Sequence, residues 1–202
     1  MIVPEKFPYG AGWINALTCG TGTTPIVMVH GADRKLQNAG HWKGFLAETA
    51  TTAETTTTMF PGKKFYALDL PGHGDSEPGE LSPVAPTFED KVRTVVHFVR
   101  DVFGAPEKKV VLVGRSLGGR IVLSAAAADP IVCKSVAAFV LVAPAVDEKF
   151  MLSLPQSVLL KKTLLFWAED DPFVPFAYSK FFTSEMEVNN KHKTKLKIKK
   201  YC

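Results

Sequence analysis

The sequence lacks the features that mark several large classes of protein. Its three cysteines are an odd number and lie far apart, with neither the density of a disulfide framework nor the spacing of a zinc site. No apolar run approaches the roughly 20 residues of a membrane-spanning helix. The N-terminus has no basic segment followed by an apolar one, which is the pattern of a secretory signal. We therefore expect a soluble, cytoplasmic protein with free thiols at Cys19, Cys133 and Cys202.

Charge of one sign is also scarce, because 24 basic residues stand against 20 acidic ones for a net charge of +4. Residues 190–200, "NKHKTKLKIKK", hold six lysines and no acid, and the rest of the chain is near neutral, so nucleic-acid binding is not expected. Lys195, Lys197 and Lys199 alternate with apolar residues as they would on a strand. This pattern favours an edge strand that its lysines protect from pairing, with a surface for acidic partners or anionic lipid as the alternative.

What the chain does contain is a series of short apolar runs. Each run has four to seven apolar residues, is rich in Val, Leu and Phe, and is bounded by Gly, Pro or Asp. Continuous apolar runs of this length are typical of strands that are buried on both faces, and hence of a parallel sheet. The runs cover residues 25–30, 64–70, 109–114, 137–144 and 163–168.

Helical patterns fill the intervals between these runs. The clearest covers residues 87–104, where apolar residues recur at helical spacing, Thr87 is placed as the N-cap with Asp90 three residues on, and Gly104 ends the pattern. The other candidate helices cover residues 117–129 and 175–187. Strands that alternate with helices within 202 residues predict one α/β domain with a mostly parallel central sheet and helices on both faces.

One strand-to-helix junction carries a motif with a chemical meaning. "GRSLG" places Ser116 between Gly114 and Gly118, and chance alone would give only roughly 0.07 such matches in a chain of this length. A sharp turn there would strain the serine backbone and expose its hydroxyl, and the flanking residues must be small because strand and helix crowd together. The N–H groups that begin the following helix would stabilise a developing negative charge. The motif predicts a nucleophilic serine, with an ordinary buried serine at a tight turn as the alternative.

Four motifs in order along the chain resemble those of the α/β-hydrolase family. "VMVHGAD" resembles the family's His-Gly oxyanion loop after its third strand, and "DLPGHGDS" resembles the turn after its fourth. "GRSLGG" resembles the nucleophile elbow, and "AEDDPFVP" the segment that carries the catalytic acid, with Ala168 where the family usually has glycine. The four segments are residues 27–33, 69–76, 114–119 and 168–175. The resemblance covers the chain from about residue 25 to its end, and it implies an α/β-hydrolase fold.

The resemblance also implies roles for particular residues. Ser116 would be the nucleophile, and the backbone N–H groups of Leu117 and Ala32 would form the oxyanion hole. Asp171 matches the acid, which would orient a histidine and stabilise that histidine once it is protonated. The alternatives for the acid are Asp170 and Asp147.

A serine hydroxyl needs a base, which in this family is a histidine that follows the last strand. Four of the five histidines precede Ser116 and are expected to be structural, capping or solvated; they are His30, His41, His73 and His97. His192 lies downstream but before the predicted last strand over residues 195–201, so a surface position is favoured over the role of base. We expect that the C-terminal part is incomplete and that the base lies beyond Cys202. The alternatives are an unusual arrangement around His192 and a protein that is not catalytic.

Two further segments bear on function. Residues 48–62 are expected to form a Thr-rich loop insertion without an assigned role, and residues 148–162 leave room for a minimal lid of at most one helix. An open pocket favours hydrolysis of a small carboxylic ester, thioester or amide, and the sequence does not separate hydrolysis from acyl transfer. No metal or other cofactor is expected, because the chain has neither a metal-ligand cluster nor a phosphate-binding loop. The alternative function is a non-catalytic scaffold of the same fold that binds a protein or a small ligand.

Overall fold

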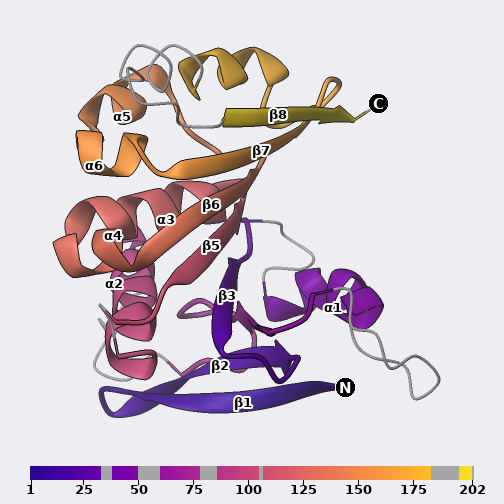
Figure 1. Ribbon diagram of the computed structural model, residues 1–202, viewed down its shortest axis with the longest axis vertical. Helices are drawn as coiled ribbons and strands as arrows, with labels where there is room; N and C mark the ends of the chain where they lie inside the picture. Colours follow the sequence, from indigo (N-terminus) through magenta and orange to yellow (C-terminus); the bar gives the residue numbers. More distant parts are fainter. Residues whose placement is uncertain (33–37, 50–59, 78–85, 105–106, 183–195, 202) are drawn as a thin grey trace.

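An eight-stranded sheet forms the frame of the computed structural model, which describes residues 1–32, 38–49, 60–77, 86–104, 107–182 and 196–201 (Figure 1). The strand order is β1-β2-β4-β3-β5-β6-β7-β8. β2 runs antiparallel to both of its neighbours, and every other neighbouring pair is parallel, which confirms the predicted mostly parallel sheet. The strands are β1 (Ile2–Tyr9), β2 (Gly12–Cys19), β3 (Thr24–Val29), β4 (Lys63–Leu68), β5 (Val110–Arg115), β6 (Val136–Val142), β7 (Lys162–Ala168) and β8 (Leu196–Tyr201).

The five apolar runs in the sequence correspond to β3, β4, β5, β6 and β7, with ends displaced by no more than about two residues. The predicted lysine-rich strand also forms, as β8 at the edge of the sheet beside β7. The hairpin of β1 and β2 was not predicted from the sequence. β1 holds Pro4 and Pro8, which lack a backbone N–H and are tolerated here because β1 is the other edge strand.

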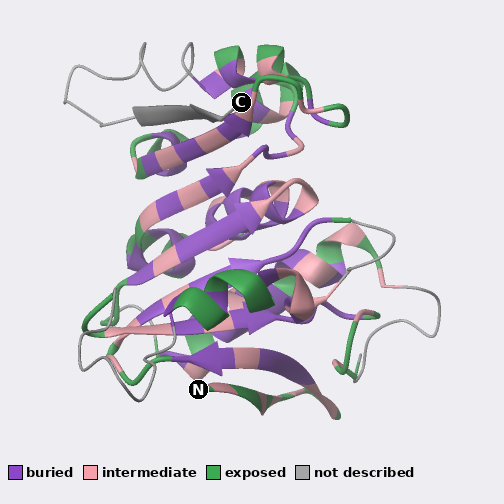
Figure 2. Ribbon diagram, turned by 90° about the vertical axis from the view of Figure 1, so that its right-hand side faces the viewer, coloured by how far each residue is buried: buried purple, intermediate pink, exposed green. Residues whose placement is uncertain are grey.

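Helices cover both faces of the sheet, as predicted. Figure 1 shows α2 to α6 on one face and α1 with η1 on the other. Seen from the side of α1, the helix lies in front of strands that are largely buried behind it (Figure 2). The helices are η1 (Ala39–Trp42), α1 (Lys43–Thr49), α2 (Phe88–His97), η2 (Phe98–Val102), α3 (Leu117–Ala128), α4 (Pro130–Ser135), α5 (Glu148–Ser153), α6 (Gln156–Leu159) and η3 (Phe176–Ser179).

The predicted helix over residues 87–104 divides into α2 and the π-helix η2. Thr87 caps α2 as expected: its side chain accepts the N–H of Asp90, whose carboxylate accepts the N–H of Thr87 in return. Gly104 follows at φ +65°, in the left-handed region. Within the predicted helix over 175–187, residues 176–182 are helical and the remainder beyond them lies outside the described residues.

The Thr-rich segment and the lid segment expected from the sequence differ in what the structure describes. In the Thr-rich segment, residues 50–59 lie outside the described residues. Residues 148–162 contain two short helices, α5 and α6, so the expectation of at most one helix was wrong. Met151, Val158 and Leu159 are buried in the main hydrophobic core, because this segment connects β6 to β7 on the face of the sheet that also carries α3.

The hydrophobic core lies on both faces of the sheet. The larger part packs the sheet against α2 to α6, and its largest fully buried side chains include Trp167, Phe98 and Phe139. The smaller part packs η1 and α1 against the opposite face, with Trp42 and Leu46 against Val113. In the part of the chain that the structure describes, no helix is both long and apolar enough to cross a membrane.

Candidate active site

Ser116 occupies the turn between β5 and α3 in a backbone conformation that non-glycine residues rarely adopt. Its φ is +50° and its ψ is −120°. Three backbone hydrogen bonds hold it: its N–H donates to the carbonyl of Val142 at 2.9 Å, and its carbonyl accepts from Gly119 at 3.0 Å and from Ala145 at 2.9 Å. A strained residue persists only where its surroundings over-determine it, and here β6 and α3 both do so. The strained turn expected from the sequence motif is therefore present.

The glycines around Ser116 are required by close backbone contacts. A Cβ on Gly114 would lie 2.5 Å from the carbonyl oxygen of Gly118, and a Cβ on Gly118 would lie 2.4 Å from that of Val29. Real Cβ atoms do not approach backbone so closely, so strand, turn and helix could not pack this tightly with any larger residue. A Cβ on Gly31 would lie 3.0 Å from the Cβ of Ser116, which brings the loop after β3 directly against the serine.

The two backbone N–H groups that the sequence analysis proposed for an oxyanion hole belong to neighbouring segments. Leu117 is the first residue of α3, and the N–H groups of a helical first turn have no acceptor within their own helix. Ala32 follows Gly31 in the loop that packs against Ser116, and it is exposed. The structure thus brings the loop after β3 to the start of α3, as the motif order implied.

His30 supports this loop as a buried, neutral side chain. Its Nε2 accepts the backbone N–H of Leu70 at 3.2 Å, and its Nδ1 lies 2.9 Å from the carbonyl oxygen of Gly31. This pattern requires a proton on Nδ1 and none on Nε2. Burial of the ring lowers the pKa of His30 to about 4, which keeps it neutral. The His73 ring lies 5.1 Å from it, with Nδ1 against the carbonyl of Pro71.

Asp69 is a buried carboxylate whose role the sequence analysis did not find. It accepts hydrogen bonds from the side chain of Asn15 at 2.7 Å and from the backbone N–H groups of Ala39 at 2.5 Å and Asp75 at 3.0 Å. A Cβ on Gly74 would lie 2.2 Å from its Oδ2, so only glycine fits there. Asp69 is the first residue of the "DLPGHGDS" motif, which was the one sequence signal for its importance. Its partners on β2 and η1 are distant in sequence, so no local pattern predicts them.

Asp171 lies in the loop that follows β7, and β7 pairs with β6, the neighbour of the strand that leads into Ser116. Its Oδ1 accepts the backbone N–H groups of Phe173 at 2.9 Å and Val174 at 2.8 Å. The indole N–H of Trp167 donates to the carbonyl of Val174 at 2.7 Å and holds the far end of this turn. Within the described residues, Oδ2 of Asp171 forms no hydrogen bond.

The alternative acids are placed differently. Asp170 is exposed, whereas Asp171 is partly buried. Asp147 caps α5 by accepting the N–H of Phe150 at 2.8 Å, and its other oxygen pairs with Arg120 at 3.3 Å. The hydrogen bond from Phe150 and the charge of Arg120 lower the pKa of Asp147. Both oxygens of Asp147 are therefore engaged in holding α5.

The described histidines have partners other than Ser116. All hydrogen bonds of His30 and His73 go to the segments named above, and those of His97 go to Asp101 and to the carbonyl of Pro8. His41 contacts the side chain of Arg115. His192, the downstream candidate for the base, lies outside the described residues.

A pocket of about 300 Å³ opens near the amino end of β4, whereas Ser116 lies at the carboxyl end of β5. Its lining includes the Glu5–Lys64 ion pair and residues at the amino end of β4. Ligands of open α/β sheets bind outside the carboxyl ends of the strands, where Ser116 lies, so we assign this pocket no part in the site. Among the described residues, no group of three or more His, Cys, Asp or Glu side chains could hold a metal ion.

Comparison with known proteins identifies the family. The profile of the Alpha/beta hydrolase family matches residues 26–189, and the chain belongs to that family. Among proteins with curated functions, none matches the sequence.

Several solved structures share the fold. A predicted CIB-like hydrolase from Thermoplasma acidophilum is 22% identical, with a TM-score of 0.67 over 99% of this chain and 87% of the other. A serine hydrolase from the polyaromatic hydrocarbon-degrading bacterium Cycloclasticus zankles is 14% identical, with a TM-score of 0.71 over 99% and 90%. Alpha/beta hydrolase domain-containing protein 10 from mouse is 18% identical, with a TM-score of 0.65 over 98% and 88%. At these identities the likeness is one of fold.

Proposed function

We propose that this protein is a serine hydrolase that cleaves a small carboxylic ester, thioester or amide through an acyl-enzyme. The observation that carries the proposal is the conformation of Ser116, which stands at φ +50° at the start of α3 with the Gly31 loop packed against it. Its hydroxyl would attack the carbonyl carbon and expel the alcohol, thiol or amine, and water would then release the acid.

In this proposal the oxyanion hole and the acid both lie at the carboxyl ends of the parallel strands. The N–H groups of Leu117 and Ala32 would donate to the oxyanion of the tetrahedral intermediate. Asp171 is the favoured acid, because within the described residues its Oδ2 forms no hydrogen bond, whereas both oxygens of Asp147 hold α5. It would orient a histidine and stabilise the imidazolium that forms during the reaction.

The base in this proposal is a histidine other than the four described ones, whose rings serve other contacts. His192 is the histidine of the sequence that remains as a candidate. Substrates are expected to be small molecules, since α5 and α6 of the connection from β6 to β7 pack into the core and leave little chain in that connection for a large lid.

The proposal is tested by the hydrolysis of p-nitrophenyl acetate and butyrate. We expect turnover by the wild type, none above background in Ser116→Ala, and wild-type turnover in Ser157→Ala, whose serine is exposed on α6. Turnover retained in Ser116→Ala would contradict the mechanism. No turnover by the wild type on any acyl ester would favour the alternative, a scaffold that binds a protein or a small ligand.

A second pair of variants identifies the base. If His192 is the base, His192→Ala loses turnover along with Asp171→Asn. If another group is the base, His192→Ala keeps turnover and Asp171→Asn loses it.

A further inference from the structure

Lysines stand where three neighbouring strands of the sheet begin. β5, β6 and β7 are parallel neighbours, so their first residues share one edge of the sheet, about 10 Å wide across the three strands. The lysines directly precede β5, end the helix α4 that leads into β6, or stand at the start of β7. These five residues, which we call the basic edge, are Lys108, Lys109, Lys134, Lys161 and Lys162.

Acidic residues do not neutralise the basic edge. Four of its lysines are exposed and Lys161 is partly buried, and none of the five forms an ion pair with another described residue. Lys109 instead donates to the backbone carbonyl of Lys134 at 2.8 Å, which holds two lysines close together. Glu107 is the acid next to them in sequence, and nearby Asp129 is already engaged in an ion pair with an arginine. The basic edge is therefore a local positive patch on a chain whose net charge is only +4.

Exposed aliphatic side chains stand among these lysines. Leu160, next to Lys161, is 41% exposed, and Ile131, on the same short helix as Lys134, is 37% exposed. Figure 1 shows α4 and α6 on one side of the molecule, beside the starts of β6 and β7. Lysines around aliphatic side chains suit the surface of an anionic bilayer, because the ammonium groups meet the headgroups and the aliphatic groups enter the boundary with the acyl chains.

A nucleic acid suits this surface less well. A lysine ammonium is a point charge without the planar fork with which arginine recognises phosphates and bases. Among the described residues, the exposed aromatic side chains belong to other segments, so the basic edge has no ring on which a base could stack.

The two ends of β7 carry opposite charges. The strand begins at Lys162, and Glu169, Asp170 and Asp171 follow its carboxyl end. An anionic surface attracts the first end and repels the second. It would therefore meet the amino ends of the strands, with the carboxyl ends turned away from it.

We propose that the basic edge, together with Leu160 and Ile131, is a docking surface for an anionic lipid bilayer. The protein lies on that surface with the carboxyl ends of its parallel strands turned toward the solution. The proposal does not rest on the proposed function, because none of these residues belongs to the candidate active site. Small substrates would reach Ser116 from the aqueous side.

Vesicle flotation tests the docking surface without any reaction. It compares vesicles of phosphatidylcholine alone with vesicles that also contain about 30% phosphatidylserine, at about 50 mM salt. We expect the wild type to float only with the anionic vesicles and to be released at about 500 mM salt. Equal binding to neutral vesicles, or no binding to anionic ones, would overturn the proposal.

Variants matched in net charge test the location of the surface. Each lysine near an anionic surface strengthens binding by about fivefold, so Lys134→Gln/Lys162→Gln should weaken it by about 10- to 30-fold. Lys43→Gln/Lys149→Gln removes two exposed lysines of α1 and α5, lowers the net charge equally, and should change binding by less than about twofold. Urea unfolding checks that each variant is folded. Equal losses would assign the binding to total charge and overturn the proposal.

The aliphatic contact has its own matched pair. Leu160→Ser should weaken binding to anionic vesicles by about three- to tenfold. Leu152→Ser, at a 61% exposed position of α5, should change it by less than about twofold. Unchanged binding in a folded Leu160→Ser variant would overturn the docking geometry. Binding to duplex DNA that Lys134→Gln/Lys162→Gln weakens, without binding to vesicles, would assign the surface to a nucleic acid instead.

Discussion

The nucleophile and the acid of the candidate site are held in different ways. Ser116 is fixed by three backbone hydrogen bonds, to β6, to α3 and to Ala145 in the loop after β6, and by glycines that allow no larger residue. Asp171 is held within its own turn, which is tied to the core through one hydrogen bond from Trp167. Phe173 in that turn is 90% exposed, so little packs over it in the described part of the chain. Stability and activity should therefore be coupled at the serine and separable at the acid.

The largest separable effect is expected at Asp171. Asp171→Asn keeps the oxygen that accepts from Phe173 and Val174 but removes the charge that would orient the base. Activity should fall by about 10³- to 10⁴-fold, while the free energy of unfolding changes by less than about 1 kcal/mol. Ester kinetics and urea unfolding measure both. Asp170→Asn is the matched control and should change neither; equal losses in the two variants would contradict the assignment.

Beside the nucleophile, the addition of a single methyl group should destabilise the fold. Gly118→Ala would place a methyl group 2.4 Å from the carbonyl oxygen of Val29 and 2.5 Å from that of His30, both backbone atoms that cannot turn away. We expect a loss of about 3 kcal/mol in the free energy of unfolding, together with loss of activity. Gly44→Ala in α1 has open space and should be neutral or stabilising by up to about 1 kcal/mol. Similar stabilities for the two variants would show that the elbow is not packed as described.

His30 makes stability near the nucleophile depend on pH. Its folded pKa of about 4 lies below the ordinary value of 6.5, so the unfolded chain binds a proton first as the pH falls. Stability should be constant above about pH 6.5 and fall by roughly 3 kcal/mol between pH 6.5 and 4. The lowered pKa values of Asp90, Asp129 and Asp147, whose ordinary value is 3.8, and of Glu5, whose ordinary value is 4.5, remove stability only near the acid end of this window and below it.

Urea unfolding between pH 7 and 4 measures this slope of the free energy of unfolding against pH. His30→Gln keeps an acceptor for the N–H of Leu70 but does not titrate, so the slope should be largely absent in that variant. His73→Gln is the control and should keep it. A slope that persists in His30→Gln would assign it to another group.

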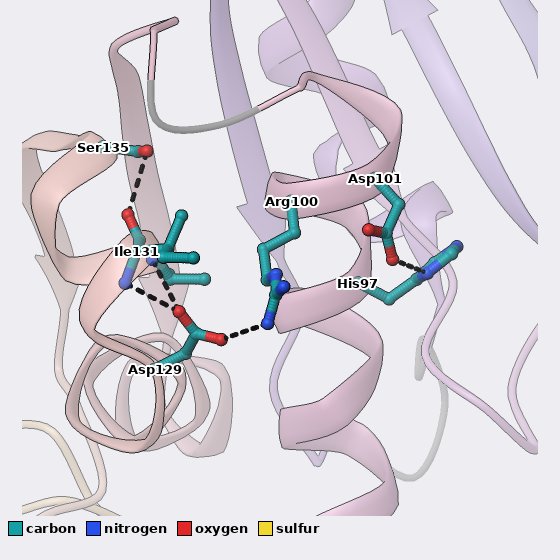
Figure 3. Close-up of polar contacts among 7 residues, drawn as sticks. His97, Arg100, Asp101, Asp129, Ile131 and Ser135 are labelled. Atoms are coloured by element: carbon teal, nitrogen blue, oxygen red, sulfur yellow. Dashed lines mark hydrogen bonds and ion pairs between the residues drawn. The ribbon is translucent and has the colours of Figure 1, made fainter.

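The smallest effect on stability and activity is expected for contacts that involve neither Ser116 nor Asp171. Figure 3 shows His97 facing Asp101, and Arg100 reaching Asp129 at the start of α4. His97 also donates to the carbonyl of Pro8 at 2.9 Å, which ties α2 to β1. His97→Phe should cost about 1 kcal/mol in the free energy of unfolding and leave kcat unchanged. For comparison, Arg100→Met removes the ion pair with Asp129. A loss of activity in His97→Phe would mean that this histidine serves the site.

The sequence predicts the nucleophile end better than the rest because its constraints are local. Three residues at the turn, Gly114, Ser116 and Gly118, already demand small residues and a strained serine, and the structure has both. β1 was not predicted because an exposed edge strand with two prolines has no continuous apolar run.

The supporting contacts were not predicted for another reason. Asp69 meets Asn15 across 54 residues, and Arg115 meets His41 across 74. No local pattern indicates such contacts, because they arise only when β2, β4 and β5 come together in the sheet.

The most direct test of the nucleophile is whether a fluorophosphonate reacts with Ser116. Peptide mass spectrometry of the labelled wild type should find one phosphonyl group, on the peptide that contains Ser116, and Ser116→Ala should take none. The label would show that the strained serine is activated by a base, whichever histidine supplies it. An unlabelled but folded wild type, or a label that persists in Ser116→Ala, would contradict the claim that Ser116 is the nucleophile.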